Sequence, residues 1–464
     1  MKTDNHIRGT MLVSQKELMI WSKRKWRAYI KKFGKDLKKA PRYTIAGIEF
    51  PPNAAEAQTS IAGTVGTGKS NAIKELLDTV RKLDGRAIIY DRMGAYVRDF
   101  YDPERDIILN PFDAKGRSKH WTPWLDAKND IDREALAKSF IPTKAKDHDS
   151  FWKEAAATVF SSLLETYADP QNKEDKKKPL EALTEMLLAR PIDELLIAVE
   201  GTSAMAHISK EGDKATASIR STAASYLNCL KHLQTPDIGR DFSITEWLQD
   251  ETSDSWLFLA CGTKSRDTMR PLLSAWYSTA MRALMSLDPS EDRRIWFVND
   301  ELPSMDQING LSTCLSEGRK YGACSLLATQ SPSQIVDIYG FQQAQTITSN
   351  CQTKIVFRES EPQNAEKLSQ LFGNLEIEET NEGISYGAND MRDGVTQSQQ
   401  RRKQALVSVT DIQNLKVNHC YLRDSKGKIK HLKLTIAKQN ANTKNQKEPE
   451  AHASEKSNSS KPSP

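Results

Sequence analysis

Residues 63–70, Gly-Thr-Val-Gly-Thr-Gly-Lys-Ser, constrain the fold of this chain more than any other stretch. They match the phosphate-binding pattern G-x-x-x-x-G-K-[ST]. The apolar residues Ile61 and Ala62 precede the pattern, and a segment with helical periodicity, residues 71–83, follows it. A strand, this loop and a helix in that order predict a nucleotide site in an α/β domain.

Each residue type in the loop has a chemical reason. The glycines let backbone N–H groups close around phosphates, and the following helix adds its positive N-terminus. Lys69 would supply a charge to the outer phosphates of ATP, and Ser70 a hydroxyl to Mg²⁺. The alternative is a glycine-rich turn that binds no nucleotide. The residues expected to bind ATP are Gly63, Thr64, Val65, Gly66, Thr67, Gly68, Lys69 and Ser70.

An acidic pair at the end of an apolar strand is the expected partner of this loop. Residues 294–300 are Arg-Ile-Trp-Phe-Val-Asn-Asp, and Glu301 follows. Asp300 would hold the Mg²⁺ shell, and Glu301 would polarise the attacking water. The alternative is the N-terminal cap of a helix. Asn299, the residue before the pair, is more polar than is usual in a buried strand.

Two further candidates flank the next apolar strand, Ala323–Thr329. Gln330 follows it, where a polar side chain can sense the terminal phosphate and position water, or can simply cap the strand. Arg319 precedes it and ends a helix, where a cation is favourable in any case. In a ring-forming ATPase, Arg319 could instead reach the neighbouring subunit's phosphate as an arginine finger. Spacing leaves both alternatives open.

Apolar strands that alternate with helices predict a mainly parallel sheet of the doubly wound type. Between residues 130 and 233 the periodicity is helical throughout, which predicts an all-α domain inserted into the α/β domain. The strands expected besides that of the phosphate loop are 43–50 (strand or hairpin), Arg86–Asp91, 106–109, 255–261, Ile295–Asn299, Ala323–Thr329, 353–358 and a closing hairpin at 418–436 that turns at 425–428.

These patterns predict five parts. They are an N-terminal arm (1–42), the first part of the nucleotide-binding domain (43–129), the helical insertion (130–233), the second part of the nucleotide-binding domain (234–438) and a disordered tail (439–464).

Composition excludes several classes. With 27% charged and 38% hydrophobic residues and no long apolar run, we expect no transmembrane segment and no signal peptide. The six cysteines are scattered, as expected for buried thiols in a reducing compartment, and the eight histidines lack the spacing of a metal site.

Positive charge is concentrated near the N-terminus, although the net charge is only +5. Residues 23–42 carry ten Lys or Arg against Asp36 alone, with Trp26, Tyr29 and other apolar residues at helical spacing. A basic amphipathic helix is therefore expected. It could lie at a membrane surface, contact nucleic acid, or dock on the protein with a solvated face.

Several segments, in this order, resemble the type IV coupling proteins, the TraD/TrwB family of conjugation and type IV secretion ATPases. They span roughly residues 43–436. The segments are 63–70, 89–94 (Ile-Tyr-Asp-Arg-Met-Gly), 110–113 (Asn-Pro-Phe-Asp), 121–124 (Trp-Thr-Pro-Trp), Asp300-Glu301, 318–322 (Gly-Arg-Lys-Tyr-Gly) and 328–331 (Ala-Thr-Gln-Ser).

The resemblance implies a RecA-like P-loop motor domain with an inserted all-α domain, assembled as a homo-hexamer around a DNA channel at the inner membrane. It makes Arg319 a finger acting in trans and Gln330 a phosphate sensor. It places the helical insertion at the cytoplasmic mouth of the ring, where relaxosome proteins dock.

The function expected is an ATPase that pumps DNA and links the relaxase–DNA complex to a type IV secretion channel during conjugation. One alternative is a nucleotide-switched docking receptor without sustained pumping. Another is a general RecA-like DNA translocase or helicase, against which the helical insertion and the two proline motifs argue. No sequence-reading motif occurs in the chain, so DNA binding should be nearly independent of sequence.

Two features depart from the family. Its members usually begin with transmembrane helices, and none is expected here. The chain is thus expected at the cytoplasmic face of the bacterial inner membrane through a missing or borrowed anchor, with residues 23–42 as a juxtamembrane remnant. Some relatives also place an arginine about twelve positions before the phosphate-loop lysine, where this chain has Ala57. A nucleotide contact from that position is therefore in doubt.

Overall fold

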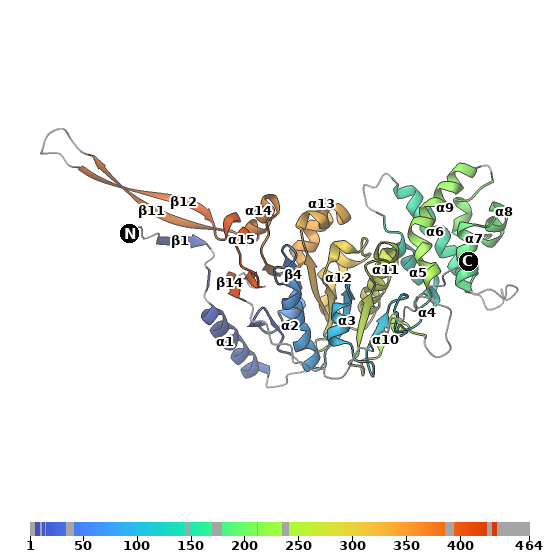
Figure 1. The fold of residues 1–464 in the computed structure, drawn as a ribbon, viewed down its shortest axis with the longest axis horizontal. Coiled ribbons are helices and arrows are strands. Elements are labelled where there is room, and N and C mark those ends of the chain that lie inside the picture. The colour runs from blue at the N-terminus through green and yellow to red at the C-terminus, as the bar shows by residue number, and fades with distance from the viewer. Residues whose placement is uncertain are drawn as a thin grey trace, which may run out of the picture.

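The computed structural model describes residues 5–9, 12–13, 15–33, 41–143, 149–168, 179–210, 212–233, 241–385, 394–424 and 429–433 (Figure 1). The predicted disordered tail and the predicted turn at residues 425–428 lie outside these residues. No helix in the described part is long and apolar enough to cross a membrane.

A nine-stranded sheet forms the centre of the molecule, in the order β14-β13-β10-β4-β9-β8-β5-β7-β6. The seven strands from β10 to β6 are parallel, and β13 and β14 add antiparallel to the β10 edge. The predicted fold class is confirmed. The strands are β4 (Thr59–Ala62), β5 (Arg86–Asp91), β6 (Ile107–Leu109), β7 (Trp256–Ala260), β8 (Ile295–Asn299), β9 (Ala323–Thr329), β10 (Thr353–Val356), β13 (His419–Arg423) and β14 (Ile429–Lys433).

Helices cover both faces of this sheet, so its central strands are buried on both sides. In β5, Ala87 and Ile89 face one hydrophobic cluster, whereas Ile88 and Tyr90 face the other. Helix α2 packs in the first cluster, and α11 in the second. The helices are α2 (Lys69–Lys82), α3 (Ala95–Phe100), α10 (Ile244–Gln249), α11 (Arg266–Met285), α12 (Leu311–Glu317), α13 (Pro332–Asn350), α14 (Pro362–Gln370) and α15 (Val409–Gln413).

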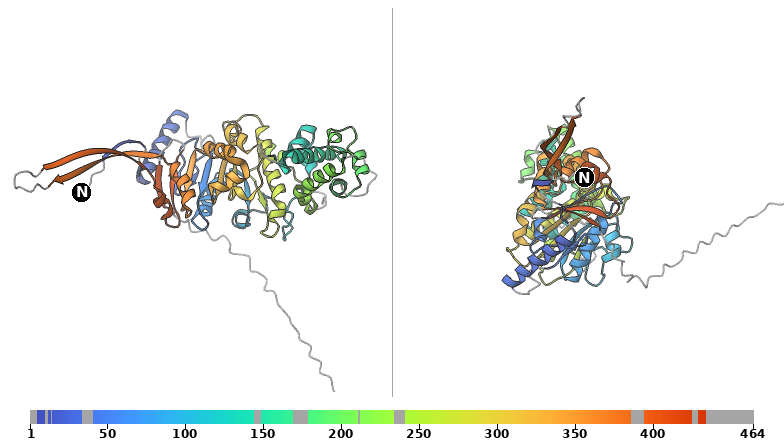
Figure 2. Two further views of the ribbon diagram at one scale, coloured as in Figure 1. Left: turned by 90° about the horizontal axis from the view of Figure 1, so that it is seen from above. Right: turned by 90° about the vertical axis from the view of Figure 1, so that its left-hand side faces the viewer.

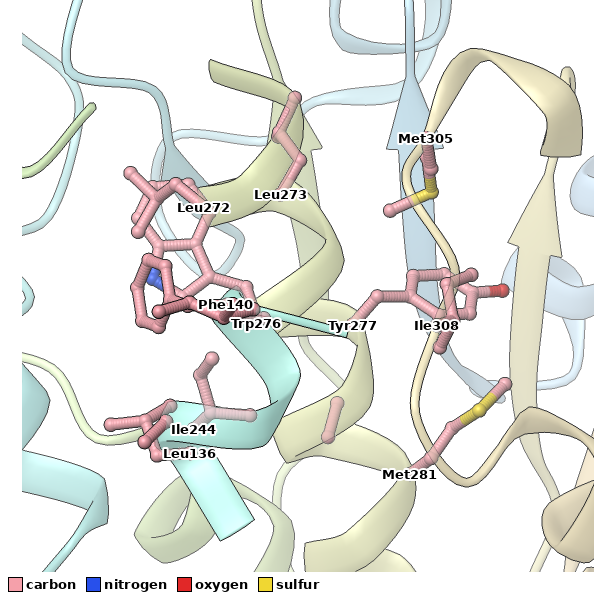
Figure 3. Packing of buried hydrophobic residues seen from close by; sticks show 14 of the residues in the cluster. Leu136, Phe140, Ile244, Leu272, Leu273, Trp276, Tyr277, Met281, Met305 and Ile308 are labelled. Carbon is pink, nitrogen blue, oxygen red and sulfur yellow. The ribbon is translucent and has the colours of Figure 1, made fainter. Parts of the chain in front are cut away.

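Every described element of regular structure between residues 130 and 233 is helical, as predicted. These helices share one hydrophobic cluster with α11. Figure 3 shows α11 between Phe140 of α5 on one side and Met305 and Ile308 on the other. The domain boundaries themselves stay a prediction. The helices are α5 (Asp130–Phe140), α6 (Ser150–Thr166), α7 (Pro179–Leu188), α8 (Ile192–Ala198) and α9 (Asp213–Leu227), and the short helix α4 (Pro123–Asp126) precedes them.

The basic N-terminal helix forms, but earlier in the chain than predicted. Helix α1 spans Gln15–Phe33, and residues 34–40 lie outside the described part. Leu18 and Trp26 are buried, and the Trp26 indole Nε1 donates to the Phe50 carbonyl at 2.9 Å. This carbonyl follows the small hairpin of β2 (Thr44–Ile45) and β3 (Ile48–Glu49), which was predicted. The apolar face of α1 is thus docked on the protein, and its basic face is exposed.

A long antiparallel hairpin was not predicted. Strands β11 (Asn374–Ser385) and β12 (Gly394–Ala405) pair along their full length, and β1 (Asn5–Gly9) adds to β11. Figures 1 and 2 show that this three-stranded sheet projects from the body, at the end of the molecule opposite the helical insertion. Its strands are rich in Glu, Gln and Arg, so they lack the apolar alternation by which strands are recognised.

Candidate nucleotide-binding site

The phosphate loop lies between β4 and α2, as the sequence predicts. Gly63 has φ +147°, and a Cβ there would lie 2.7 Å from the Phe357 Cβ, so only glycine fits beside the end of β10. The Thr64 N–H and hydroxyl both donate to the Arg358 carbonyl at 2.9 Å. The loop is therefore anchored to the strand next to its own.

Lys69 is the first residue of α2, and it is buried. Its ammonium donates to the Gly63 carbonyl and, at 3.1 Å, to the Thr64 carbonyl. Burial lowers the pKa of Lys69, and nearby carboxylates, Glu301 first, oppose this shift. A cation held in the loop and surrounded by carboxylates is suited to bind the outer phosphates of a nucleotide.

The acidic pair lies where the sequence predicts it, at the end of β8. The side-chain oxygen of Asn299 accepts a hydrogen bond from the Glu301 N–H at 3.1 Å, which explains why a polar residue ends this buried strand. Its amide group also contacts the Met305 sulfur at 3.0 Å. Asn299 is thus the buried residue that fixes the turn into Glu301.

Asp300 faces the phosphate-loop helix. Burial raises the pKa of its carboxyl, while Tyr96, Lys69 and Ser70 oppose the shift. The Tyr96 hydroxyl is buried, faces Asp300 and Ser70, and has no hydrogen-bond partner of good geometry in the described part of the chain. The chain therefore gathers three hard oxygen groups at one point, the ligand type that Mg²⁺ and its bound waters require.

Glu301 has two side-chain neighbours. Gln330, at the end of β9, lies against it, and the Arg92 Nη1 is 3.7 Å from its Oε2 atom. Burial raises the pKa of Glu301, and Gln330, Lys69 and Arg92 oppose the shift. The predicted carboxylate and the predicted polar sensor are thus brought together.

These groups line one pocket of about 450 Å³ at the carboxyl ends of β4, β9, β8 and β5. Sequence reasoning assigned no role to five of its residues. For Arg92 and Met93 the only signal was the motif at 89–94. The residues lining the pocket are Val65, Gly66, Gly68, Lys69, Ser70, Asn71, Arg92, Met93, Asp300, Glu301, Gln330, Val417 and Asn418.

Asn418, which is far from the phosphate loop in the sequence, also lines the pocket. Its N–H donates to the Thr67 carbonyl at 2.8 Å, and its side-chain oxygen accepts from the Asn71 amide at 2.9 Å. It has φ +61°, the left-handed region that asparagine tolerates. The loop before β13 is thereby fastened to the phosphate loop.

Two sequence candidates lie away from the pocket. Arg319, in the 3₁₀ helix Gly318–Tyr321, is exposed and precedes β9, whereas Gln330 follows that strand. Seven parallel-strand residues span about 23 Å, so Arg319 lies at the opposite edge of the sheet from its own pocket. Ala57 is buried, and its carbonyl accepts from the Gln352 N–H, so it does not line the pocket.

Comparison with known proteins then identifies the family. The profile described as "Type IV secretion-system coupling protein DNA-binding domain" matches residues 42–437. The chain belongs to the type IV secretion-system coupling proteins. It is 32% identical over 364 residues to the coupling protein TraD of Escherichia coli (strain K12), covering 78% of this chain and 50% of TraD. It is 23% identical over 300 residues to VirD4 of Bartonella quintana, covering 61% of this chain and 46% of VirD4.

Solved coupling-protein structures have the same fold. The unbound conjugative coupling protein TrwBdeltaN70 superimposes with a TM-score of 0.79 at 28% identity, covering 94% of each chain. TrwB in complex with ADP and Mg²⁺ gives a TM-score of 0.77 at 27% identity, covering 94% of this chain and 95% of that one. The present chain spans about half the length of the curated coupling proteins that it matches.

Proposed function

We propose that the chain is an ATP-driven DNA translocase that links a relaxase–DNA complex to a type IV secretion channel during conjugation. One observation carries this proposal. The phosphate loop, the acidic pair and Gln330 converge on a single pocket, in a chain of the coupling-protein family. The solved TrwB complexes with ADP and Mg²⁺ and with a non-hydrolysable ATP analogue support ATP and Mg²⁺ as its ligands.

We assign each residue a role that its place in the pocket supports. The loop 63–68 surrounds the phosphates with backbone N–H groups, and Lys69 neutralises their outer charge. Glu301 orients the attacking water and accepts its proton, while Gln330 holds the Glu301 carboxylate and contacts the terminal phosphate. In hydrolysis the water oxygen bonds to the γ-phosphorus, the bond from that phosphorus to the oxygen bridging it to the β-phosphate breaks, and ADP and phosphate leave.

Ser70 and Asp300 are the residues that would hold Mg²⁺. The Ser70 hydroxyl and the Asp300 carboxylate are hard oxygen ligands, and the buried Tyr96 hydroxyl that faces both of them suits a metal-bound water. When bound, the metal neutralises developing charge on the phosphates. The three side chains would orient the bound ion and its waters.

The same family assignment supports a set of partners. We infer a ring of six copies around DNA, with Arg319 of each copy directed at the nucleotide of its neighbour, because Arg319 is exposed and remote from its own pocket. The exposed basic face of α1 would lie toward the inner membrane, and the helical insertion would receive relaxosome proteins. DNA contacts should be made mainly to phosphates, so affinity should fall linearly with salt in log–log terms.

The deciding experiment measures ATP hydrolysis with and without DNA. A translocase should hydrolyse ATP several-fold faster with DNA, and a Lys69→Ala control should be inactive under both conditions. A chain that binds ATP with Mg²⁺ and hydrolyses it negligibly with any DNA would instead be a nucleotide-switched docking receptor.

A further inference from the structure

A turn that is held by side-chain hydrogen bonds places Arg92 in the pocket. Strand β5 runs beside β8, with Tyr90 opposite Asn299, so Arg92 emerges next to Glu301. The buried Asp91 carboxylate fixes the turn, because it accepts from the N–H groups of Met93 at 3.3 Å, Ala95 at 3.0 Å and Val97 at 2.8 Å. Asp91 therefore orients the loop, and Arg92 is the residue that this loop presents to the pocket.

The contact between Arg92 and Glu301 leaves the guanidinium incompletely satisfied. Its Nη1 lies 3.7 Å from the Glu301 Oε2, within range of an ion pair but too long for a hydrogen bond. Its Nε is buried and has no hydrogen-bond partner in the described part of the chain. Guanidinium groups carry five donors in a planar fork that matches carboxylate and phosphate oxygens.

The surroundings favour an anion as the missing partner. Arg92 lines the pocket together with Lys69, Ser70 and Gln330, and its side chain is 28% exposed. Lys69 and Ser70 mark the phosphate side of the pocket, and Glu301 and Gln330 mark the side of the attacking water. A long side chain at the Glu301 end is thus positioned beyond the outermost phosphate.

We propose that Arg92 binds the terminal phosphate of a nucleoside triphosphate in its own subunit, exchanging the Glu301 carboxylate for phosphate oxygens. The proposal rests on nucleotide binding at this pocket, as proposed above. It gives the chain a residue that distinguishes triphosphate from diphosphate without a neighbouring subunit. It also ties release of Glu301 to arrival of the triphosphate, so that the base becomes free only when its substrate is present.

The test compares the affinities for ADP and for the non-hydrolysable analogue ADPNP, each with Mg²⁺, by calorimetry. All variants carry Arg319→Ala, so that a neighbour's finger cannot contribute. Arg92→Ala should weaken ADPNP binding about tenfold or more, the scale of one charge-assisted phosphate contact, and leave ADP binding within about twofold. Arg92→Lys should recover only part of the loss, because it lacks the fork.

Arg98 provides a matched control. It is an arginine of the adjoining helix α3, its side chain is 70% exposed, and it pairs with Asp99 rather than with the pocket. Arg98→Ala removes the same charge and should change neither affinity by more than about twofold. Glu301→Gln should tighten ADPNP binding by freeing Arg92, and this gain should vanish when Arg92→Ala is added.

Equal losses for ADP and ADPNP in Arg92→Ala would mean that Arg92 only supports the loop, and would overturn the proposal. Unchanged affinities, or equal effects of Arg92→Ala and Arg98→Ala, would overturn it as well. A parent protein that bound neither nucleotide would overturn the nucleotide site together with the role of Arg92. Because no hydrolysis is involved, failure of the proposed ATPase activity would be seen separately, in the turnover assay.

Discussion

The two sides of the nucleotide pocket are built in different ways. The phosphate-loop side is one continuous stretch, 63–70, held by its own backbone and by the Arg358 carbonyl. The opposite wall is assembled from segments far apart in the chain, which contribute Arg92, Glu301, Gln330 and Asn418. The loop therefore depends on local sequence, whereas the wall depends on the strand order of the sheet.

This difference predicts how substitutions divide. Changes in the loop should damage nucleotide binding and hydrolysis together, because its backbone N–H groups and Lys69 surround the phosphates in both steps. Changes in the wall should affect hydrolysis and nucleotide binding to different extents, because its side chains act on the terminal phosphate and on water.

Lys69→Ala should give the largest loss. It removes the one cation within the loop, whose charge-assisted hydrogen bonds to phosphate are worth on the order of 1.5–3 kcal/mol each. Nucleotide affinity should fall, and turnover should be abolished in an ATPase assay. Turnover near that of the natural sequence would contradict the assignment of the pocket.

Arg319→Ala tests a group outside both sides of the pocket. As a finger in trans it should leave nucleotide binding by the isolated chain intact and cut turnover by about 10³-fold or more. Mixed rings of Arg319→Ala and Lys69→Ala subunits should regain partial activity where an intact finger meets an intact loop. If confirmed mixed rings stay as inactive as either parent, Arg319 does not act in trans.

Among changes in the wall, Glu301→Gln should show the largest difference between its effect on hydrolysis and its effect on ATP binding. It keeps the shape of the side chain and leaves Asp300 in place, but it removes the group that accepts a proton from water. Turnover should fall by roughly 10²–10⁴-fold, the usual range for a general base, while ATP binds and persists. Loss of binding as severe as in Lys69→Ala would instead make Glu301 a structural residue.

The same division explains what could be predicted from sequence. The phosphate loop, the acidic pair and the buried strands were all predicted, because motif spacing and apolar runs such as Ile295–Asn299 are local signals. Glu301 and Gln330 lie close together because they follow the carboxyl ends of two adjacent parallel strands, β8 and β9. Arg92 and Asn418 could not be assigned, because their role arises only when distant segments meet.

The hairpin of β11 and β12 was missed for a different physical reason. Strands are recognised by apolar alternation, which reflects one buried face. Ile377 is buried, but its direct cross-strand partner is Arg402, which is exposed. A hairpin that pairs a buried apolar residue with an exposed charged one does not show the apolar alternation on which the prediction relied.

Two glycines of the loop offer a smaller and matched test. Both have positive φ, +75° at Gly66 and +120° at Gly68. A Cβ at Gly66 would meet nothing within 4 Å, but one at Gly68 would lie 2.6 Å from the Asn418 Oδ1 and 3.1 Å from its Cα. Backbone strain costs about 1–3 kcal/mol at each site, and only Gly68 adds a clash.

Gly68→Ala should therefore weaken ADP binding at least about tenfold more than Gly66→Ala, measured by calorimetry. Equal losses in the two variants would show that the contact between the loop and Asn418 does not shape the site. In that case the loop and the wall of the pocket would be independent of each other.

The smallest effect is expected at Asn418 itself. Asn418→Gly keeps the left-handed backbone but removes the side-chain hydrogen bond to Asn71, which is exposed and should be worth about 0.5 kcal/mol. Asn418→Ala loses the same bond and must also hold φ +61°, which adds about 1–2 kcal/mol. Asn71→Ala removes the bond from its other end, so it should match Asn418→Gly. Denaturant unfolding measures the three differences. If Asn418→Ala were no worse than Asn418→Gly, the left-handed backbone at this position would impose no measurable strain on a side chain, and φ +61° would not be the reason for an asparagine here.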